Sequence, residues 1–307
     1  MGFIEWFSDP LQYEFMQRAL IEVILTGLVT GAIGSYVVLR GLSFIGDALS
    51  HAIFPGIVIA FLVGQSIFVG AIAFGVLTSV LIAVIATNAR VKEDSAIGVL
   101  FAGMFALGIL LISTSTNFTR DLTAFLFGNV LGVSDEDIVL SAIVGAIVLV
   151  TIVVFYKELL LVSFDRIAAQ AMGLPVFWLD LLLLVLISLT IVVSLRAVGN
   201  ILVVAMLITP AAAARLLTDR LPVMMALSAA IGVLSGVTGL YISYHNDVAA
   251  GASIVLVATG VFMLVWLFAP HHGVVPSRLL RSRALAGQQP EAVIVFESPE
   301  LRTPGRH

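Results

Sequence analysis

The chain has 307 residues, of which 60% are hydrophobic and 11% are charged, with a mean hydropathy of +1.15 and a formal net charge of −4 at pH 7. A soluble domain is typically about half apolar and about a quarter charged, so this composition excludes a soluble enzyme and excludes disorder for most of the chain. The small acidic net charge and the lack of a basic stripe exclude nucleic acid as a partner, and the absence of cysteine excludes disulfides and thiolate metal sites.

Nine stretches of the chain are long and apolar enough to cross a bilayer as helices, which need about 20 mostly apolar residues each. The predicted spans are 19–39, 44–63, 67–87, 96–113, 138–156, 178–195, 199–217, 222–243 and 250–268. A further apolar segment, 122–133, is too short to span, and we expect it to lie at the interface or to dip into the membrane. The sequence therefore predicts an all-α polytopic membrane protein, with membrane lipid as its surroundings.

The basic residues predict the orientation of the chain, because lysine and arginine favour the cytoplasmic side. With the N-terminus outside, the outer side holds only Arg18, Arg120 and Arg196, and the other twelve of the 15 basic residues lie inside. We therefore expect a cytoplasmic C-terminus. Residues 1–275 are predicted to form the transmembrane domain, and residues 276–307, which are polar and without periodicity, a mostly disordered cytoplasmic tail.

The first span carries Glu22 near its outer end. An ionised group inside a membrane is expensive, so it needs either a partner or access to the interface. Arg18 lies one helical turn earlier, and we expect Glu22 to snorkel to the interface or to pair with Arg18. The same span is rich in small residues, including Gly27, Gly31 and Gly34, which allow close helix packing in lipid.

The second span begins with Asp47 and His51, which share one face of a helix because they are four residues apart. A carboxylate and an imidazole together suit a borderline divalent cation such as manganese, iron or zinc. Pro55 and Gly56 follow directly and should break or bend the helix. The alternative is that Asp47 caps the span and His51 is a packing residue. Two ligands are too few for a closed site, so a second copy of the chain or water would have to complete it.

The longest inner loop is predicted to contain a short helix from Arg166 to Met172. Asp165 can cap its N-terminus, and Gly173 and Pro175 can end it. Such a helix in a cytoplasmic loop is either a docking element or an ordinary connection.

The eighth span ends at His245, Asn246 and Asp247, behind Tyr241 and Tyr244. This group could receive an incoming cation, but an interfacial aromatic belt with a polar turn is the simpler interpretation. The chain has no phosphate-binding Gly-x-x-x-x-Gly-Lys-Ser/Thr motif, no His-Glu-x-x-His and no Gly-x-Ser-x-Gly. We therefore expect that the chain is not an enzyme.

Several segments together resemble the membrane permease subunit of the ATP-binding-cassette importers for manganese, zinc or iron, over about residues 18–270. They are VVLRGLS at 37–43, GDALSH at 46–51, FGNVLGVS at 127–134, the loop 164–175 and ITPAA at 208–212. NARVKEDSAIG at 88–98 and FYKELL at 155–160 look most like the manganese/iron branch of this family. The tail after residue 276 has no counterpart in the resemblance.

The resemblance implies that Asp47 and His51 line the path of the transported ion, and that no cofactor is stably bound. It also implies that the loop helix is a coupling helix that seats in the ATPase, formed by Phe164, Asp165, Arg166, Ala168, Ala171 and Gly173. The implied partners are a separate ATP-binding-cassette ATPase, an extracytoplasmic metal-binding protein, and a second permease copy, either identical or a related chain. The implied location is the bacterial cell membrane. The alternative function is a secondary cation transporter driven by a proton or ion gradient, with Asp47 and His51 as the relay.

Overall fold

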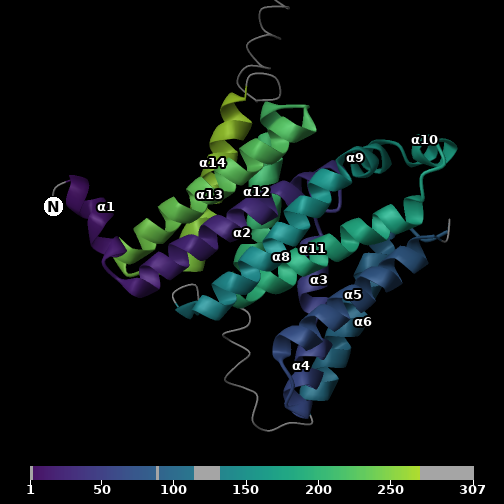
Figure 1. Ribbon diagram of the computed structural model, residues 1–307, viewed down its shortest axis with the longest axis horizontal. Helices are drawn as coiled ribbons and strands as arrows, with labels where there is room; N and C mark the ends of the chain where they lie inside the picture. The colour runs from purple at the N-terminus through teal and green to yellow at the C-terminus, as the bar shows by residue number, and fades with distance from the viewer. Residues whose placement is uncertain (1–2, 88–89, 114–131, 270–307) are drawn as a thin grey trace, which may run out of the picture.

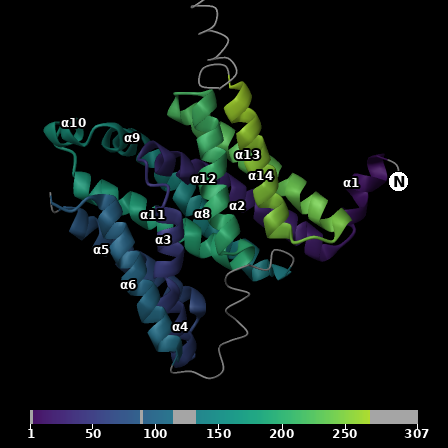
Figure 2. The same cartoon turned by 180° about the vertical axis from the view of Figure 1, so that it is seen from behind.

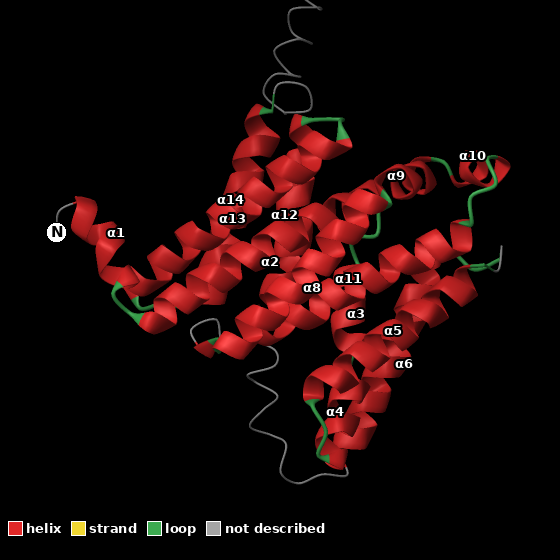
Figure 3. Cartoon of the chain, in the orientation of Figure 1, coloured by secondary structure: helices red, strands yellow, loops and turns green. Residues whose placement is uncertain are grey.

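The computed structural model describes residues 3–87, 90–113 and 132–269, and within these ranges the regular structure consists of helices without strands (Figure 3). The helices are α1 Phe3–Leu11, α2 Glu14–Leu39, α3 Ile45–Ala52, α4 Phe54–Val63, α5 Ile67–Ala86, α6 Glu93–Ser113, α8 Asp135–Val154, α9 Tyr156–Phe164, α10 Arg166–Ala171, α11 Val176–Val198, α12 Asn200–Leu217, α13 Leu221–Asn246 and α14 Ala250–Phe268. The predicted tail at 276–307 and nearly all of the predicted short segment at 122–133 lie outside the described residues.

Eight spans of the described chain are long and apolar enough to cross a membrane, and Leu202–Leu217 within α12 is a shorter apolar helix. Eight of the nine predicted spans are therefore found as such, and the ninth, 199–217, is the shorter apolar helix. The all-α polytopic fold is confirmed. Helices α3 and α4 together form the second span, Ile45–Val63. The span is interrupted at Ile53, since Pro55 in the first turn of α4 has no N–H to donate to the carbonyl of His51.

The helices form two groups around a shared middle (Figures 1 and 2). Helices α4 to α6 lie on one side, α12 to α14 lie on the other, and α2, α3, α8 and α11 lie between them. Helix α2 is largely buried because its small residues admit its neighbours: Gly27 and Gly31 face the backbone of α13, and Gly34 faces the backbone of α12. This close approach confirms the packing role predicted for these glycines.

The prediction for Glu22 was wrong. Its side chain is fully buried and accepts hydrogen bonds from Ser141 of α8 at 2.7 Å and from Thr26 at 3.3 Å. Arg18 instead pairs with Glu14 at 2.6 Å and with Asp135 at 2.8 Å, where all three side chains reach solvent. The reason is the position of each residue along α8: Glu22 lies against Ser141 in the buried part of that helix, whereas Arg18, one turn earlier, lies against its exposed first residue, Asp135.

Candidate functional site

Asp47 and His51 lie together on one face of α3. The Oδ1 atom of Asp47 is 3.5 Å from Nδ1 of His51, and the same ring nitrogen is 2.9 Å from the Asp47 backbone carbonyl oxygen. Ser50 donates a hydrogen bond to that carbonyl at 2.8 Å. The site is thus formed by one turn of helix, as the spacing of four residues predicts.

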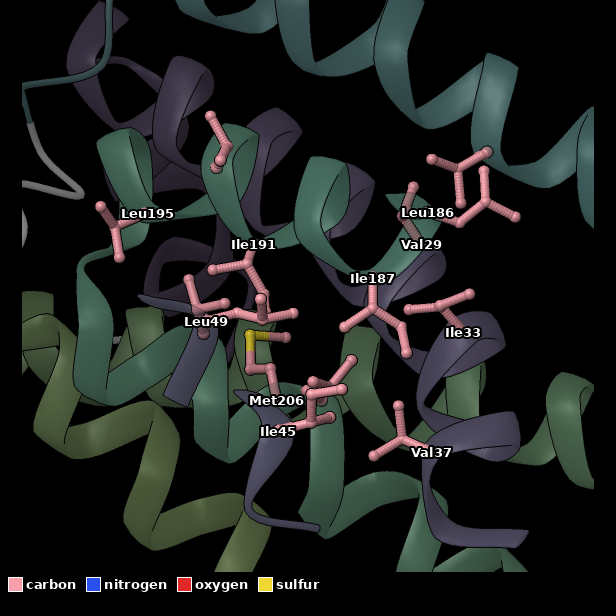
Figure 4. Packing of buried hydrophobic residues seen from close by; sticks show 14 of the residues in the cluster. Val29, Ile33, Val37, Ile45, Leu49, Leu186, Ile187, Ile191, Leu195 and Met206 are labelled. Carbon is pink, nitrogen blue, oxygen red and sulfur yellow. The ribbon is translucent and has the colours of Figure 1, made fainter. Parts of the chain in front are cut away.

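The opposite face of α3 anchors it in the core. Ile45 and Leu49 are fully buried and belong to a cluster that includes Ile187 and Ile191 of α11 and Met206 of α12 (Figure 4). Because this apolar face is held against α11 and α12, the polar face with Asp47 and His51 must point away from the core. The side chain of Asp47 is 39% exposed and that of His51 is 18% exposed.

Two aromatic rings of α6 hold the imidazole of His51. The ring centroids of Phe101 and Phe105 lie 5.3 Å and 5.1 Å from that of His51, both in edge-to-face geometry. Edge-to-face contacts of this kind favour one orientation of a ring over others. The imidazole therefore has little freedom to rotate, although its edge remains close to the carboxylate of Asp47.

The donor set of the site is incomplete in one chain. Within the described residues there is no group of three or more histidine, cysteine, aspartate or glutamate side chains that could hold a metal ion. An imidazole nitrogen and a carboxylate oxygen are suitable ligands for manganese, iron or zinc, but a first-row cation takes at least four ligands. A carboxylate exposed within a membrane span is also costly next to lipid. The geometry therefore fits a site that faces water or a second protein chain.

The predicted loop helix exists as α10. The Asp165 carboxylate accepts hydrogen bonds from the backbone N–H groups of Ile167 and Ala168, both at 2.9 Å, and Gly173 ends the segment with φ of +78°. The helix is one residue shorter than predicted, because Met172 is its C-cap. It lies at the end of α9, on the opposite side of the molecule from α1 (Figure 1).

One side of α10 is anchored and the other is open. Ala169 is buried in a small cluster with Val162, Val176 and Leu179. Phe164, Ile167 and Met172 are 61%, 80% and 72% exposed, although they are large and apolar. Of the residues predicted for the coupling helix, Phe164, Asp165, Arg166, Ala171 and Gly173 are exposed and Ala168 is half-buried. The sequence prediction did not single out Ile167 and Met172, although a large apolar side chain in a short helical segment between two membrane spans was a signal that could have found them.

His245 is engaged with the N-terminal helix. Its Nε2 atom lies 3.0 Å from the backbone carbonyl oxygen of Trp6, and its ring stacks on Trp6 with a centroid distance of 4.5 Å. Trp6 also stacks on Tyr241 at 5.4 Å. This arrangement supports the interfacial aromatic belt, and the structure does not bring His245 to Asp47 and His51.

Comparison with known proteins gave matches over most of the chain. Residues 12–269 match the ABC 3 transport family. The manganese transport system membrane protein MntC of Halalkalibacterium halodurans is 50% identical over 269 residues, which cover 88% of this chain and 92% of that protein. The manganese import system permease protein ScaB of Streptococcus gordonii is 47% identical, with 87% of this chain and 95% of that protein covered. A probable iron transport system membrane protein of Haemophilus influenzae is 41% identical, with 85% and 96% covered.

A solved structure has the same fold. PsaBC from Streptococcus pneumoniae in complex with Fab matches with a TM-score of 0.79 and 42% sequence identity, covering 92% of this chain and all of that one. The family match begins at residue 12 and thus includes α2 to α14 but not α1.

Proposed function

The chain belongs to the ABC 3 transport family, and from this we propose that it is the membrane permease subunit of an ATP-driven importer for divalent metal ions, with manganese as the main cargo. The names of its relatives favour manganese, and a probable iron transport protein among them makes iron the next candidate cargo. The observation that carries the proposal is the pair Asp47 and His51, held together on a half-exposed face of a broken membrane span.

We propose that this pair supplies half of the transport site. A second permease copy, identical or related, would place its own Asp47 and His51 opposite the first pair, so that the dimer offers two carboxylates and two imidazoles. Four nitrogen and oxygen ligands are sufficient for a first-row cation. The same contact would also cover the exposed Asp47 carboxylate, which lipid cannot solvate.

The energy would come from a separate ATPase that docks on α10. Phe164, Ile167 and Met172 offer an exposed apolar surface at the end of the molecule away from α1, and the anchored side of α10 gives this surface a fixed base. The chain's basic residues favour placing this end in the cytoplasm and the N-terminus outside the cell membrane. A metal-binding protein would then deliver the ion from the extracytoplasmic side. Work is required because a site that binds a divalent ion tightly also releases it slowly.

The test is uptake of labelled manganese by the permease reconstituted with its ATPase and binding protein. We expect Asp47→Ala and His51→Ala each to abolish uptake, because each removes one proposed ligand from every copy of this chain, and so two of the four in a dimer of identical copies, while the assembled complex still elutes intact. Asp219→Ala is the matched control, since Asp219 is an exposed acid that pairs with Arg215 at 2.7 Å away from the site. Unchanged uptake in both site variants would refute the assignment of the site.

Two further measurements separate the alternatives. Competition by unlabelled zinc and iron would rank the cargo ions. Uptake by the permease without the ATPase, driven by a proton gradient, would favour a secondary cation transporter over an importer driven by ATP.

A further inference from the structure

A network of ion pairs links α10 to α2, α6 and α11. Asp180, in the second turn of α11, lies between two guanidinium groups: its Oδ1 is 2.8 Å from Nη1 of Arg40, and its Oδ2 is 2.6 Å from Nη2 of Arg166. Arg166 also lies 3.4 Å from Oε2 of Glu93 at the start of α6. These four residues come from the end of α2 and the starts of α6, α10 and α11.

The network is balanced in charge, and its Arg40–Asp180 pair is largely buried. It holds two positive and two negative side chains, and those of Arg40 and Asp180 are only 6% and 12% exposed. A buried ion pair adds little net stability compared with apolar packing, but losing one member leaves the other charged in a dry site. The network therefore resists any movement that would separate its members, which makes it suited to carrying motion from one helix to another.

The two halves of the network differ in their freedom to move. The side chain of Arg166 is 43% exposed, and it borders a cavity of about 240 Å³ that is also lined by Glu93, Gln170 and Asp180. The guanidinium group of Arg166 can therefore move closer to Asp180 or closer to Glu93 and still remain paired with a carboxylate of the network. Arg40 does not line this cavity and its side chain is only 6% exposed, so a shift of Asp180 towards Arg40 must displace the end of α2.

The end of α2 is connected firmly to the ion site. Arg40 donates a hydrogen bond from Nε to Ser163 of α9 at 3.1 Å and caps the C-terminus of α2. Leu42 then donates its N–H to the carbonyl of Val37 at 3.0 Å, and Ile45 donates to Leu42 at 2.9 Å, so the connection into α3 is hydrogen-bonded. Asp47 follows two residues later. Helix α11, which carries Asp180, packs against the buried face of α3 (Figure 4).

We infer that Asp180 is a positioning residue of the transport cycle, which transmits movement of α10 to Asp47 and His51 through Arg40 and α11. The inference rests on the proposed function, since it requires an ATPase acting on α10 and an ion held at α3. It assigns to Asp180, Arg40 and Arg166 a role in coupling, distinct from metal binding and from docking of the ATPase.

The inference is tested with the full complex of permease, ATPase and binding protein in proteoliposomes, by measuring manganese uptake and ATP hydrolysis together. Asp180→Asn keeps the size and a hydrogen-bond acceptor but removes the charge. We expect it to leave ATP hydrolysis substantial and to lower the manganese transported per ATP by on the order of tenfold, a typical size for coupling between two sites. Manganese binding to the permease dimer should be unchanged, and Asp180→Glu should restore part of the ratio.

Asp219→Asn is the matched control, because it removes the charge of an exposed ion pair at the connection between α12 and α13, and neither Asp219 nor Arg215 is a member of the Asp180 network. Its transport ratio should equal that of the unmodified protein. Arg166→Gln provides a second test that does not depend on Asp180→Asn folding, since Arg166 is partly exposed, and it should lower the ratio in the same way.

Two outcomes would overturn the inference: an unchanged ratio in Asp180→Asn or Arg166→Gln, or a proportional loss of uptake and ATP hydrolysis with the ratio preserved. Failure of the proposed function has a different signature. In that case the unmodified complex itself would not couple manganese uptake to ATP, or Asp47→Ala would transport normally.

Discussion

Gly34 is the position at which a single methyl group should most clearly disturb the core of this protein. A Cβ atom at residue 34 would overlap with the backbone carbonyl oxygen of Leu207 on α12 and would lie 3.0 Å from its carbonyl carbon. Carbon atoms normally pack at about 3.5–4.0 Å. Because the obstacle is backbone, no side-chain rotation can relieve it, and Gly34→Ala must push α2 and α12 apart by about half an ångström or more.

The size of the effect follows from the packing along that seam, where Ile33, Val37 and Met206 are buried (Figure 4). A gap of this size forfeits about a quarter of the dispersion energy of a contact, and a buried side chain makes about 40–60 contacts of about 0.1–0.2 kcal/mol each. If three buried side chains each lose a quarter of the dispersion energy in half of their contacts, the total loss of dispersion energy is about 3 kcal/mol. The higher helix propensity of alanine stabilises α2 by about 1 kcal/mol and offsets part of this loss. The expected net destabilisation is about 2 kcal/mol, within the range typical of overpacked cores.

The assay is thermal unfolding of the purified permease at a fixed detergent concentration. We expect Gly34→Ala to lower the Tm by roughly 4–8 °C. Gly260→Ala in α14 is the matched control, since no atom lies within 4 Å of the added methyl group, and it should be neutral or raise the Tm slightly. If Gly34→Ala unfolded at the same temperature as Gly260→Ala, the close approach of α2 and α12 would be refuted.

Two further predictions concern side chains with contrasting exposure. Ile167→Asp should prevent co-purification of the ATPase while leaving the Tm of the permease within about 1–2 °C of the unmodified protein, because Ile167 is 80% exposed and supports no part of the core. Retention of the ATPase would contradict the assignment of the docking surface. Glu22→Gln should preserve the Tm, because glutamine keeps an acceptor for Ser141 and Thr26. Glu22→Leu should lower the free energy of unfolding by about 1 kcal/mol, measured by thermal unfolding, since two buried hydroxyl groups lose their partner. Equal stability of the two Glu22 variants would show that those hydrogen bonds contribute nothing.

The sequence alone determined those features of this protein that depend on residues close together along the chain. The nine apolar segments were recognisable because a chain in lipid must satisfy its backbone hydrogen bonds within each helix, so length and hydropathy suffice to find the spans. The pairing of Asp47 with His51 follows from a spacing of four residues. The cap of α10 by Asp165 and its end at Gly173 are equally local.

Only the tertiary structure decided which side of each helix faces which neighbour. A membrane helix is apolar on nearly all sides, so its sequence carries little information about facing, and for this reason Glu22 was wrongly paired with Arg18 instead of Ser141. The Arg40–Asp180–Arg166 network was unpredictable for the same reason: its members lie on separate helices, and each one alone resembles an ordinary charge at a helix end. Three-dimensional packing brings them together, because burial in a dry site makes each charge depend on partners that are distant in the sequence.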